Sequence, residues 1–229
     1  MITIIHGDDV TKSRQKLEAL TSGKKFQFFD GQKARIEEIS DSAASQELFA
    51  SQKLIVIERF TVLTKQKDFL EFLKTIESNK DIQIILWDDR VTTPTFLKKF
   101  ASSQVLVFTL PKYFFSFLDG LYPKNGKKAS QLLKQLSPSF EDAQIFYSMV
   151  KRVRLLLMAK TGDLSQFSET RSMSPWQKQN ITKQTRLWQD DALCMFYLAL
   201  FDLEKGMKTS NLPLPLINHI DILLVNALQ

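Results

Sequence analysis

The sequence predicts an α/β half followed by an all-α half. In the first half, short apolar runs alternate with amphipathic segments, and the connections between them are short. This alternation is typical of a mainly parallel, doubly wound sheet. After Pro111, apolar residues recur at helical spacing and strand-like runs end. We therefore expect an α/β domain over residues 1–111 and an all-helical domain over residues 112–229.

Five apolar runs in the first half predict strands that are buried on both faces, as in a parallel sheet covered by helices. They cover residues 2–6, 25–30, 54–58, 82–87 and 105–110. Helical patterns lie between them, at residues 10–20, 34–49, 65–78 and 95–101. Asp9 and Thr64 precede two of these patterns, and their side chains suit the N-cap position.

The second half predicts five or six helices separated by turn residues. Apolar spacing begins at Phe114 and at Ala129, and then continues through residues 145–159, 176–188, 192–205 and 216–228. Ser174 and Pro175 form a typical helix start, with serine as the cap and proline in the first turn.

Cysteine use and hydropathy indicate a cytoplasmic protein without a membrane span. The single cysteine, Cys194, excludes an internal disulfide and fits a reducing compartment. It lies in the apolar run ALCMFYLALF, which predicts a buried, inert thiol. No stretch approaches the ~18 uninterrupted apolar residues of a transmembrane helix, and the first residues resemble a strand more than a signal peptide.

The basic charge is concentrated in the second half. The chain has a net charge of +6, and residues 124–186 alone contain 12 Lys and Arg against 4 Asp and Glu. Such an excess suits either a solvated helical face or a surface that faces phosphates.

The turn after the first apolar run lacks the features of a phosphate-binding loop. Gly7 is followed by Asp8 and Asp9, and no second glycine precedes Lys12 and Ser13. Two carboxylates at this position would repel a nucleotide's phosphates. Asp88 and Asp89 follow the fourth run, where an acid could hold magnesium, but without a phosphate loop we interpret this pair as structural. We expect no bound cofactor.

A receiver-like phosphoacceptor domain is an alternative for the first half. Asp8, Asp9 and Lys112 would suit its acids and its lysine, but Glu58 stands where the phosphoacceptor aspartate should be. His6 and His219 have no neighbouring histidine or cysteine at metal-ligand spacing, so we expect no metal site. The sequence favours a binding or mechanical role without intrinsic catalysis.

An adjacent Leu48-Phe49 pair stands out in the stretch SQELFASQKLIVI, residues 45–57. Neighbouring side chains on a helix point about 100° apart, so one core contact buries both of them with difficulty. The pair is either ordinary core or an exposed apolar plug for a partner's pocket.

This stretch resembles the clamp-contacting element of the bacterial DNA polymerase III delta family, the clamp-loader subunit that opens the sliding clamp. The opening residues 4–9, IIHGDD, are similar to that family's first strand. The resemblance implies a P-loop NTPase-like (RecA/AAA+-like) first domain without a phosphate loop, which contacts the clamp. The implied clamp-binding residues are Ser45, Gln46, Leu48 and Phe49.

The second half resembles the family's helical collar domain. Similar motifs occur, in order, at residues 117–121, 127–133, 150–157, 175–178 and 200–205. The resemblance implies collar packing by Trp176 and Gln177, ATPase clamp-loader subunits as partners, and primer-template DNA as a further partner. Contacts to DNA or to other subunits are expected at Lys127, Lys128, Lys151, Arg152 and Arg154. Trp176 and Trp188 also suit plain helix-bundle core.

The chain departs from the family in one respect. The family has a small middle domain between the α/β domain and the collar, whereas here the fifth apolar run leads through Pro111 directly into the collar-like motif. The resemblance therefore implies a minimal, two-domain delta subunit. A stand-alone protein- or DNA-binding module of the same architecture is the alternative.

Overall fold

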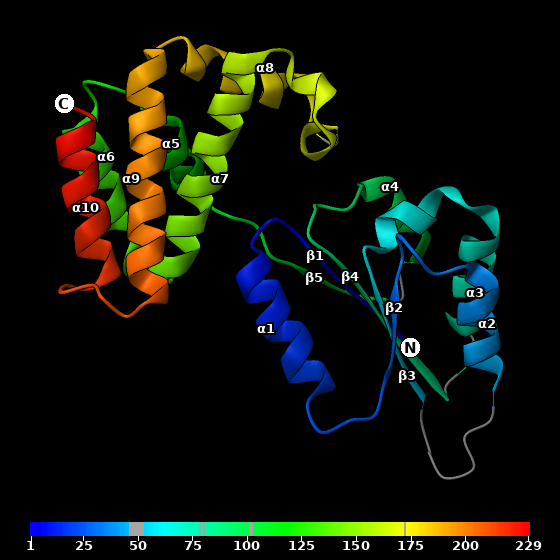
Figure 1. Ribbon diagram of the computed structural model, residues 1–229. Helices are drawn as coiled ribbons and strands as arrows, with labels where there is room; N and C mark the ends of the chain where they lie inside the picture. The colour runs from blue at the N-terminus through cyan, green and yellow to red at the C-terminus, as the bar shows by residue number, and fades with distance from the viewer. Residues whose placement is uncertain (46–52, 78, 80, 101–102, 172) are drawn as a thin grey trace. The chain divides into compact units, whose positions relative to one another are not determined.

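The computed structural model describes residues 1–229 except 46–52, 78, 80, 101–102 and 172. It divides into two compact units, Met1–Leu110 and Pro111–Gln229, each considered by itself (Figure 1). Unit 1 is a parallel sheet with helices on both faces, and unit 2 is helical. The predicted fold class, α/β followed by all-α, is confirmed.

The sheet of unit 1 has five strands in the order β2-β3-β4-β1-β5, and every neighbouring pair is parallel. The strands are β1 (Ile2–His6), β2 (Gln27–Asp30), β3 (Lys53–Glu58), β4 (Ile82–Asp88) and β5 (Gln104–Val107). The three central strands are buried on both faces, as their apolar runs predict. The edge strands β2 and β5 are shorter than the expected residues 25–30 and 105–110, since each pairs with one neighbour only.

The two faces of the sheet are covered unequally (Figure 1). On one face lie α2 (Ile36–Ala44), α3 (Lys67–Glu77) and α4 (Pro94–Leu97), and they share a large core with β1, β3 and β4. The 3-10 turns η1 (Phe60–Lys65) and η2 (Lys98–Phe100) belong to the same layer. The other face is covered by α1 (Val10–Thr21), in a smaller core that includes Leu17, Val56 and Trp87.

Two of the three predicted N-caps are confirmed. Asp9 caps α1, where its Oδ1 accepts a hydrogen bond from the backbone N–H of Lys12 at 3.2 Å. Ser174 caps α8 (Pro175–Thr185) in a reciprocal capping box with Gln177. The prediction for Thr64 is wrong. This residue lies within η1, and its hydroxyl donates to the carbonyl of Thr61 at 2.7 Å, which stabilises the 3-10 turn.

Among its described residues, unit 2 contains six α-helices. They are α5 (Lys112–Asp119), α6 (Gly126–Leu136), α7 (Asp142–Thr161), α8, α9 (Asp190–Lys208) and α10 (Leu216–Ala227). The 3-10 turns η3 (Leu164–Gln166) and η4 (Ser168–Thr170) lie between α7 and α8. The longest helix, α7, contacts α5, α8, α9 and α10, and its inner face is apolar.

Unit 2 requires a glycine where α6 approaches the end of α10. The N–H of Gly126 donates to the carbonyl of Leu228 at 3.0 Å. A Cβ atom at this position would lie 2.8 Å from the carbonyl oxygen of Leu224, closer than such atoms normally come. Over the part of the chain that the structure describes, none of these helices combines the length and the apolar character of a membrane span.

Candidate functional site

The described neighbours of the Leu48-Phe49 pair are held together by Lys53. Its ammonium group donates to the backbone carbonyl of Ser45 at 2.9 Å, to the Ser45 hydroxyl at 2.6 Å, and to the carbonyl of Ser42. Ser45 is the C-cap of α2, and Lys53 is the first residue of β3. The side chain of Lys53 therefore joins the end of α2, where the chain leaves the helix, to the start of β3.

Of the four predicted clamp-binding residues, Ser45 lies within the described part of the chain and is exposed. Gln46, Leu48 and Phe49 lie outside the described residues. The end of α2 is further tied to β2, because the Ser42 hydroxyl donates to the side-chain oxygen of Gln27. The start of β2, the end of α2 and the start of β3 thus form one connected group at the amino edge of the sheet.

The opposite, carboxyl edge of the sheet is where ligands bind in open α/β folds. Here the turn after β1 is used for contacts within the chain. The carboxylate of Asp8 accepts the N–H of Leu110 at 2.7 Å, and Asp9 caps α1. Gly7 has φ +135°, and a Cβ atom on it would lie 1.8 Å from the carbonyl oxygen of Phe108. The position of a phosphate loop is therefore occupied by the chain's own carboxylates and backbone.

The strand ends at this edge carry paired charges. Glu58, at the end of β3, forms a two-pronged ion pair with Arg14 of α1, with Nη2 and Oε2 2.8 Å apart. The Arg14 guanidinium also lies 3.6 Å from the centre of the Trp87 ring, a cation–π contact. Asp30, at the end of β2, accepts from Arg59 Nε at 2.8 Å, and this hydrogen bond holds the pKa of Asp30 below its usual value.

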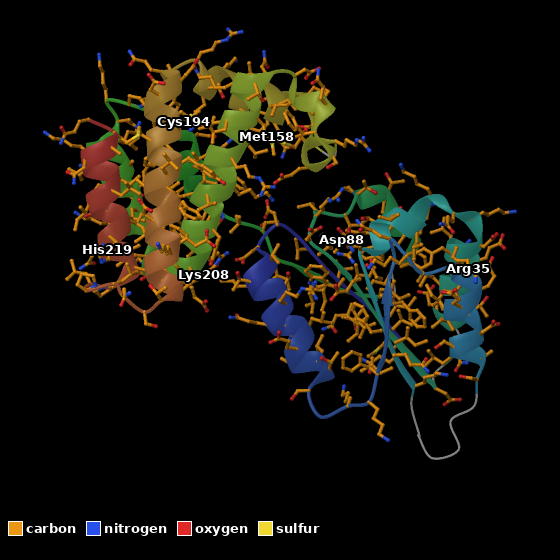
Figure 2. The ribbon with its side chains drawn as sticks, in the orientation of Figure 1. Arg35, Asp88, Met158, Cys194, Lys208 and His219 are labelled. Carbon is orange, nitrogen blue, oxygen red and sulfur yellow. The ribbon has the colours of Figure 1, made fainter. Side chains whose placement is uncertain are left out.

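Asp88, labelled in Figure 2, lies at the end of β4 and binds the backbone on two sides. One oxygen accepts from the Thr61 backbone N–H at 3.1 Å and from the Thr61 hydroxyl, and the other accepts from the Arg90 N–H at 3.2 Å. Burial raises the pKa of Asp88 despite these donors. These contacts hold η1 against the end of β4. Among the described residues, no group of three or more metal-ligating side chains comes together.

His6, at the end of β1, is buried as a neutral side chain. Its Nδ1 accepts the N–H of Thr92 at 3.2 Å, so the ring proton is assigned to Nε2. Burial lowers the pKa of His6 below 6.5. An imidazole that stays neutral in the folded protein stabilises the fold above pH 6.5, and this contribution is lost as the pH falls through the folded-state pKa.

We predict that unit 1 loses stability as the pH falls below 6.5 and that His6→Asn removes most of this dependence. Asparagine places an oxygen near the position of Nδ1 and does not titrate, and His6 is the only histidine in residues 1–110. Amide exchange of β1 and β4, followed by mass spectrometry at several pH values, measures the effect. An unchanged pH dependence in His6→Asn would assign the titration to another group.

The structure separates the five basic residues that were expected to contact DNA or other subunits. Lys127 and Lys128, in the first turn of α6, and Lys151 and Arg154, on α7, are exposed. Arg152 is largely buried and paired with Asp119, and its pKa is lowered by that burial. Arg154 is paired with Glu169. Arg152 therefore serves a contact within unit 2. Arg154 is exposed but already paired, and the three lysines remain candidates for contacts with a partner.

Two predictions about buried residues of the second half are wrong. Trp176 is 67% exposed, because it lies in the first turn of α8 on the side away from the core. Gln177 contributes by capping α8, where its side chain accepts the N–H of Ser174 at 2.8 Å. Cys194 is exposed, since α9 turns this position outward (Figure 2).

Trp188, in contrast, is core as expected. Its ring is 3% exposed and stacks on Phe196, and its indole N–H donates to the carbonyl of Leu121 at 3.1 Å. Its carbonyl accepts a hydrogen bond from the Lys160 ammonium at 2.6 Å. These contacts connect the segment after α8 with α7 and α9.

Sequence reasoning missed an apolar face on the outside of unit 2. Met195, Leu198 and Phe201 of α9 are all more than half exposed, and Ile222 and Val225 of α10 are also exposed. The signal was present: the run ALCMFYLALF is apolar all round, and a helix in a small bundle buries only one side. An exposed apolar face of this kind is typical of an interaction surface.

No protein-family model matches this sequence, and neither does any curated protein sequence. The chain is similar to the solved structure of the Bacillus subtilis DNA clamp loader delta protein YqeN, at 11% identity and a TM-score of 0.44, over 99% of this chain and 95% of that chain. It is also similar to a DNA polymerase III gamma subunit-related protein of Thermotoga maritima, at 16% identity and a TM-score of 0.38, over 99% and 93% of the two chains.

Proposed function

We propose that this chain is a non-catalytic clamp-loader subunit of the delta type, which binds the sliding clamp through Leu48 and Phe49 and helps to open it. The observation that carries the proposal is the anchoring of the chain on both sides of this pair. Lys53 fastens Ser42 and Ser45 to the start of β3. A short segment between two joined ends loses less conformational freedom when it binds, so more of its contact energy appears as affinity.

The carboxyl edge of unit 1 supports a role that does not use ATP. A nucleotide's phosphates would meet the carboxylates of Asp8 and Asp9 after β1, and Glu58 is neutralised by Arg14. In the proposed mechanism the clamp is held by contacts alone, and partner ATPase subunits supply the energy of the loading cycle.

Unit 2 supports assembly with such partners. The exposed apolar side chains of α9 and α10 would be covered in a hetero-oligomer; they are Met195, Leu198, Phe201, Ile222 and Val225. The exposed Trp176 is a second candidate for a contact between subunits, since large aromatic side chains are enriched at interfaces.

Primer-template DNA is proposed as a further partner, contacted by Lys127, Lys128 and Lys151. We predict that changing these three lysines to glutamine lowers the slope of log K against log salt by about 2–3, since each phosphate contact contributes about 0.9. A matched control changes Lys16, Lys33 and Lys65, three exposed lysines of unit 1, and removes the same net charge. Equal slopes for the two triple variants would place the DNA contact elsewhere.

The direct test is calorimetry of the purified chain with the sliding clamp of its own organism, together with co-purification of clamp and loader ATPases from cells. Binding of the clamp supports the proposal. A chain that binds DNA but neither clamp nor ATPases would instead be a stand-alone module of the same architecture.

A further inference from the structure

One face of the sheet in unit 1 is wider than its helical cover. Five strands span about 19 Å, with about 4.8 Å between neighbours, whereas one helix is about 10–12 Å across. The opposite face has α2, α3 and α4, but this face has α1, which packs on Ile5, Val56 and Trp87 of the central strands. Among the described residues, none of the helices therefore covers the edge strand β2 on the α1 face.

Two aromatic side chains at this edge of the sheet are exposed. Phe28 is 53% exposed and Phe26, just before β2, is 46% exposed. Phe29 packs into the core on the opposite face, so the alternation of the strand puts Phe28 on the α1 face, and Phe26 lies two residues before it in the chain. Exposed edge strands normally carry a lysine, a proline or a bulge that prevents pairing with another chain. The sequence of β2, Gln-Phe-Phe-Asp, contains no lysine or proline.

The charge at this strand is uneven. Lys24 and Lys25 precede β2 and are exposed, and no ion pair is formed by either with a described residue. At the other end of the strand, Asp30 is neutralised by Arg59. The amino end of β2 is therefore cationic with an apolar centre beside it, which is complementary to an acidic, partly apolar segment.

This surface adjoins the anchor of the Leu48-Phe49 pair. β2 is the direct neighbour of β3, with Gln27 opposite Ile55. The side chain of Gln27 accepts the Ser42 hydroxyl, and the Ser42 carbonyl accepts Lys53. A partner held at the end of α2 would thus have the free edge of β2 within its reach.

We propose that Lys24, Lys25, Phe26 and Phe28, the β2 edge surface, form a second contact with the sliding clamp by receiving an extended, acidic segment of that partner as an added strand. The inference rests on the proposed function and deepens it. Main-chain hydrogen bonds along β2 would give this contact its register, and cover of the two phenylalanines would add affinity.

Phe28→Thr tests the contact in the full chain, with clamp affinity measured by calorimetry. Threonine keeps the preference for a strand and removes the ring, so clamp binding is expected to weaken roughly tenfold. The matched control is Val107→Thr, a residue with 54% exposure on the other edge strand, β5, which should bind normally. Circular dichroism of both variants checks that each of them is folded.

Two further measurements identify the occupant. Lys24→Glu with Lys25→Glu should weaken clamp binding and reduce its dependence on salt. Amides in residues 24–30 should exchange more slowly once the clamp is bound. If Phe28→Thr binds the clamp as tightly as the wild type, or if amide exchange over residues 24–30 does not change when the clamp binds, the β2 contact is wrong. Clamp binding by the wild type would still support the proposed function in that case. If the wild type does not bind the clamp, both the proposed function and the β2 contact are wrong. If the variants lose affinity for DNA and not for the clamp, the surface binds nucleic acid.

Discussion

Replacing Leu48 and Phe49 together by alanine is expected to weaken binding to the sliding clamp by about 10² to 10⁴-fold. Burial of one such side chain contributes about 1.5–3 kcal/mol, and two of them at the centre of an interface account for this loss. Calorimetry of the wild type and of the double variant, side by side, measures it.

A matched control replaces Val62 and Val91 by alanine, two exposed apolar side chains of unit 1 that lie elsewhere in the chain. This control should bind as the wild type does. A Leu48→Ala/Phe49→Ala protein that has lost its circular dichroism signal would show that the pair is core. A folded double variant with full affinity would show that the clamp, if bound, is bound by another surface.

Gly7→Ala should be more damaging than an alanine at either of the other two glycines of unit 1, Gly23 and Gly31. The backbone at Gly7 has φ +135°, and the new Cβ atom would lie 1.8 Å from the carbonyl oxygen of Phe108. That carbonyl also accepts the N–H of Asp9 at 3.0 Å, and the N–H of Phe108 donates to the carbonyl of His6 at 2.9 Å, so the neighbouring backbone cannot move freely. We expect unit 1 to lose at least about 3 kcal/mol of unfolding free energy.

Gly23→Ala is the control for backbone strain alone. Gly23 also has a positive φ, +70°, but no atom of a described residue outside its immediate chain neighbours lies within 4 Å of the position that a Cβ atom would take there. Its cost should be about 1 kcal/mol. Native-state amide exchange of β1 and β4 gives the stability of unit 1 in each variant. Equal losses for the two alanines would mean that the contact with Phe108 relaxes without cost.

Several features of the fold followed from local sequence alone. The continuous apolar runs of β1, β3 and β4 predict strands buried on both faces, and the structure confirms this. The N-caps Asp9 and Ser174 were also predictable from the sequence, because an N-cap contacts a residue three positions further along the chain. Thr64 was misplaced, since the 3-10 turn η1 depends on the distant Asp88 that binds Thr61.

The sequence predicted some features of the candidate site and did not predict others. The pair Leu48-Phe49 stands out by its composition, and the missing phosphate loop is a matter of residue types between Gly7 and Ser13. The hydrogen bonds from Lys53 to the end of α2 were not predictable, because a lysine in the sequence does not indicate which carbonyl groups its ammonium group will contact.

The amino-acid sequence by itself determined the order of strands and helices, the basic character of the second half and the absence of a phosphate-binding glycine loop, because each depends on residues that are neighbours in the chain. Only the tertiary structure decided which charges and aromatic rings are available to a partner. Arg152 is withdrawn into a pair with Asp119, Trp176 is turned outward, and Phe28 is left uncovered because β2 is an edge strand. Exposure depends on what packs against a side chain from elsewhere in the chain, and local sequence does not contain that information.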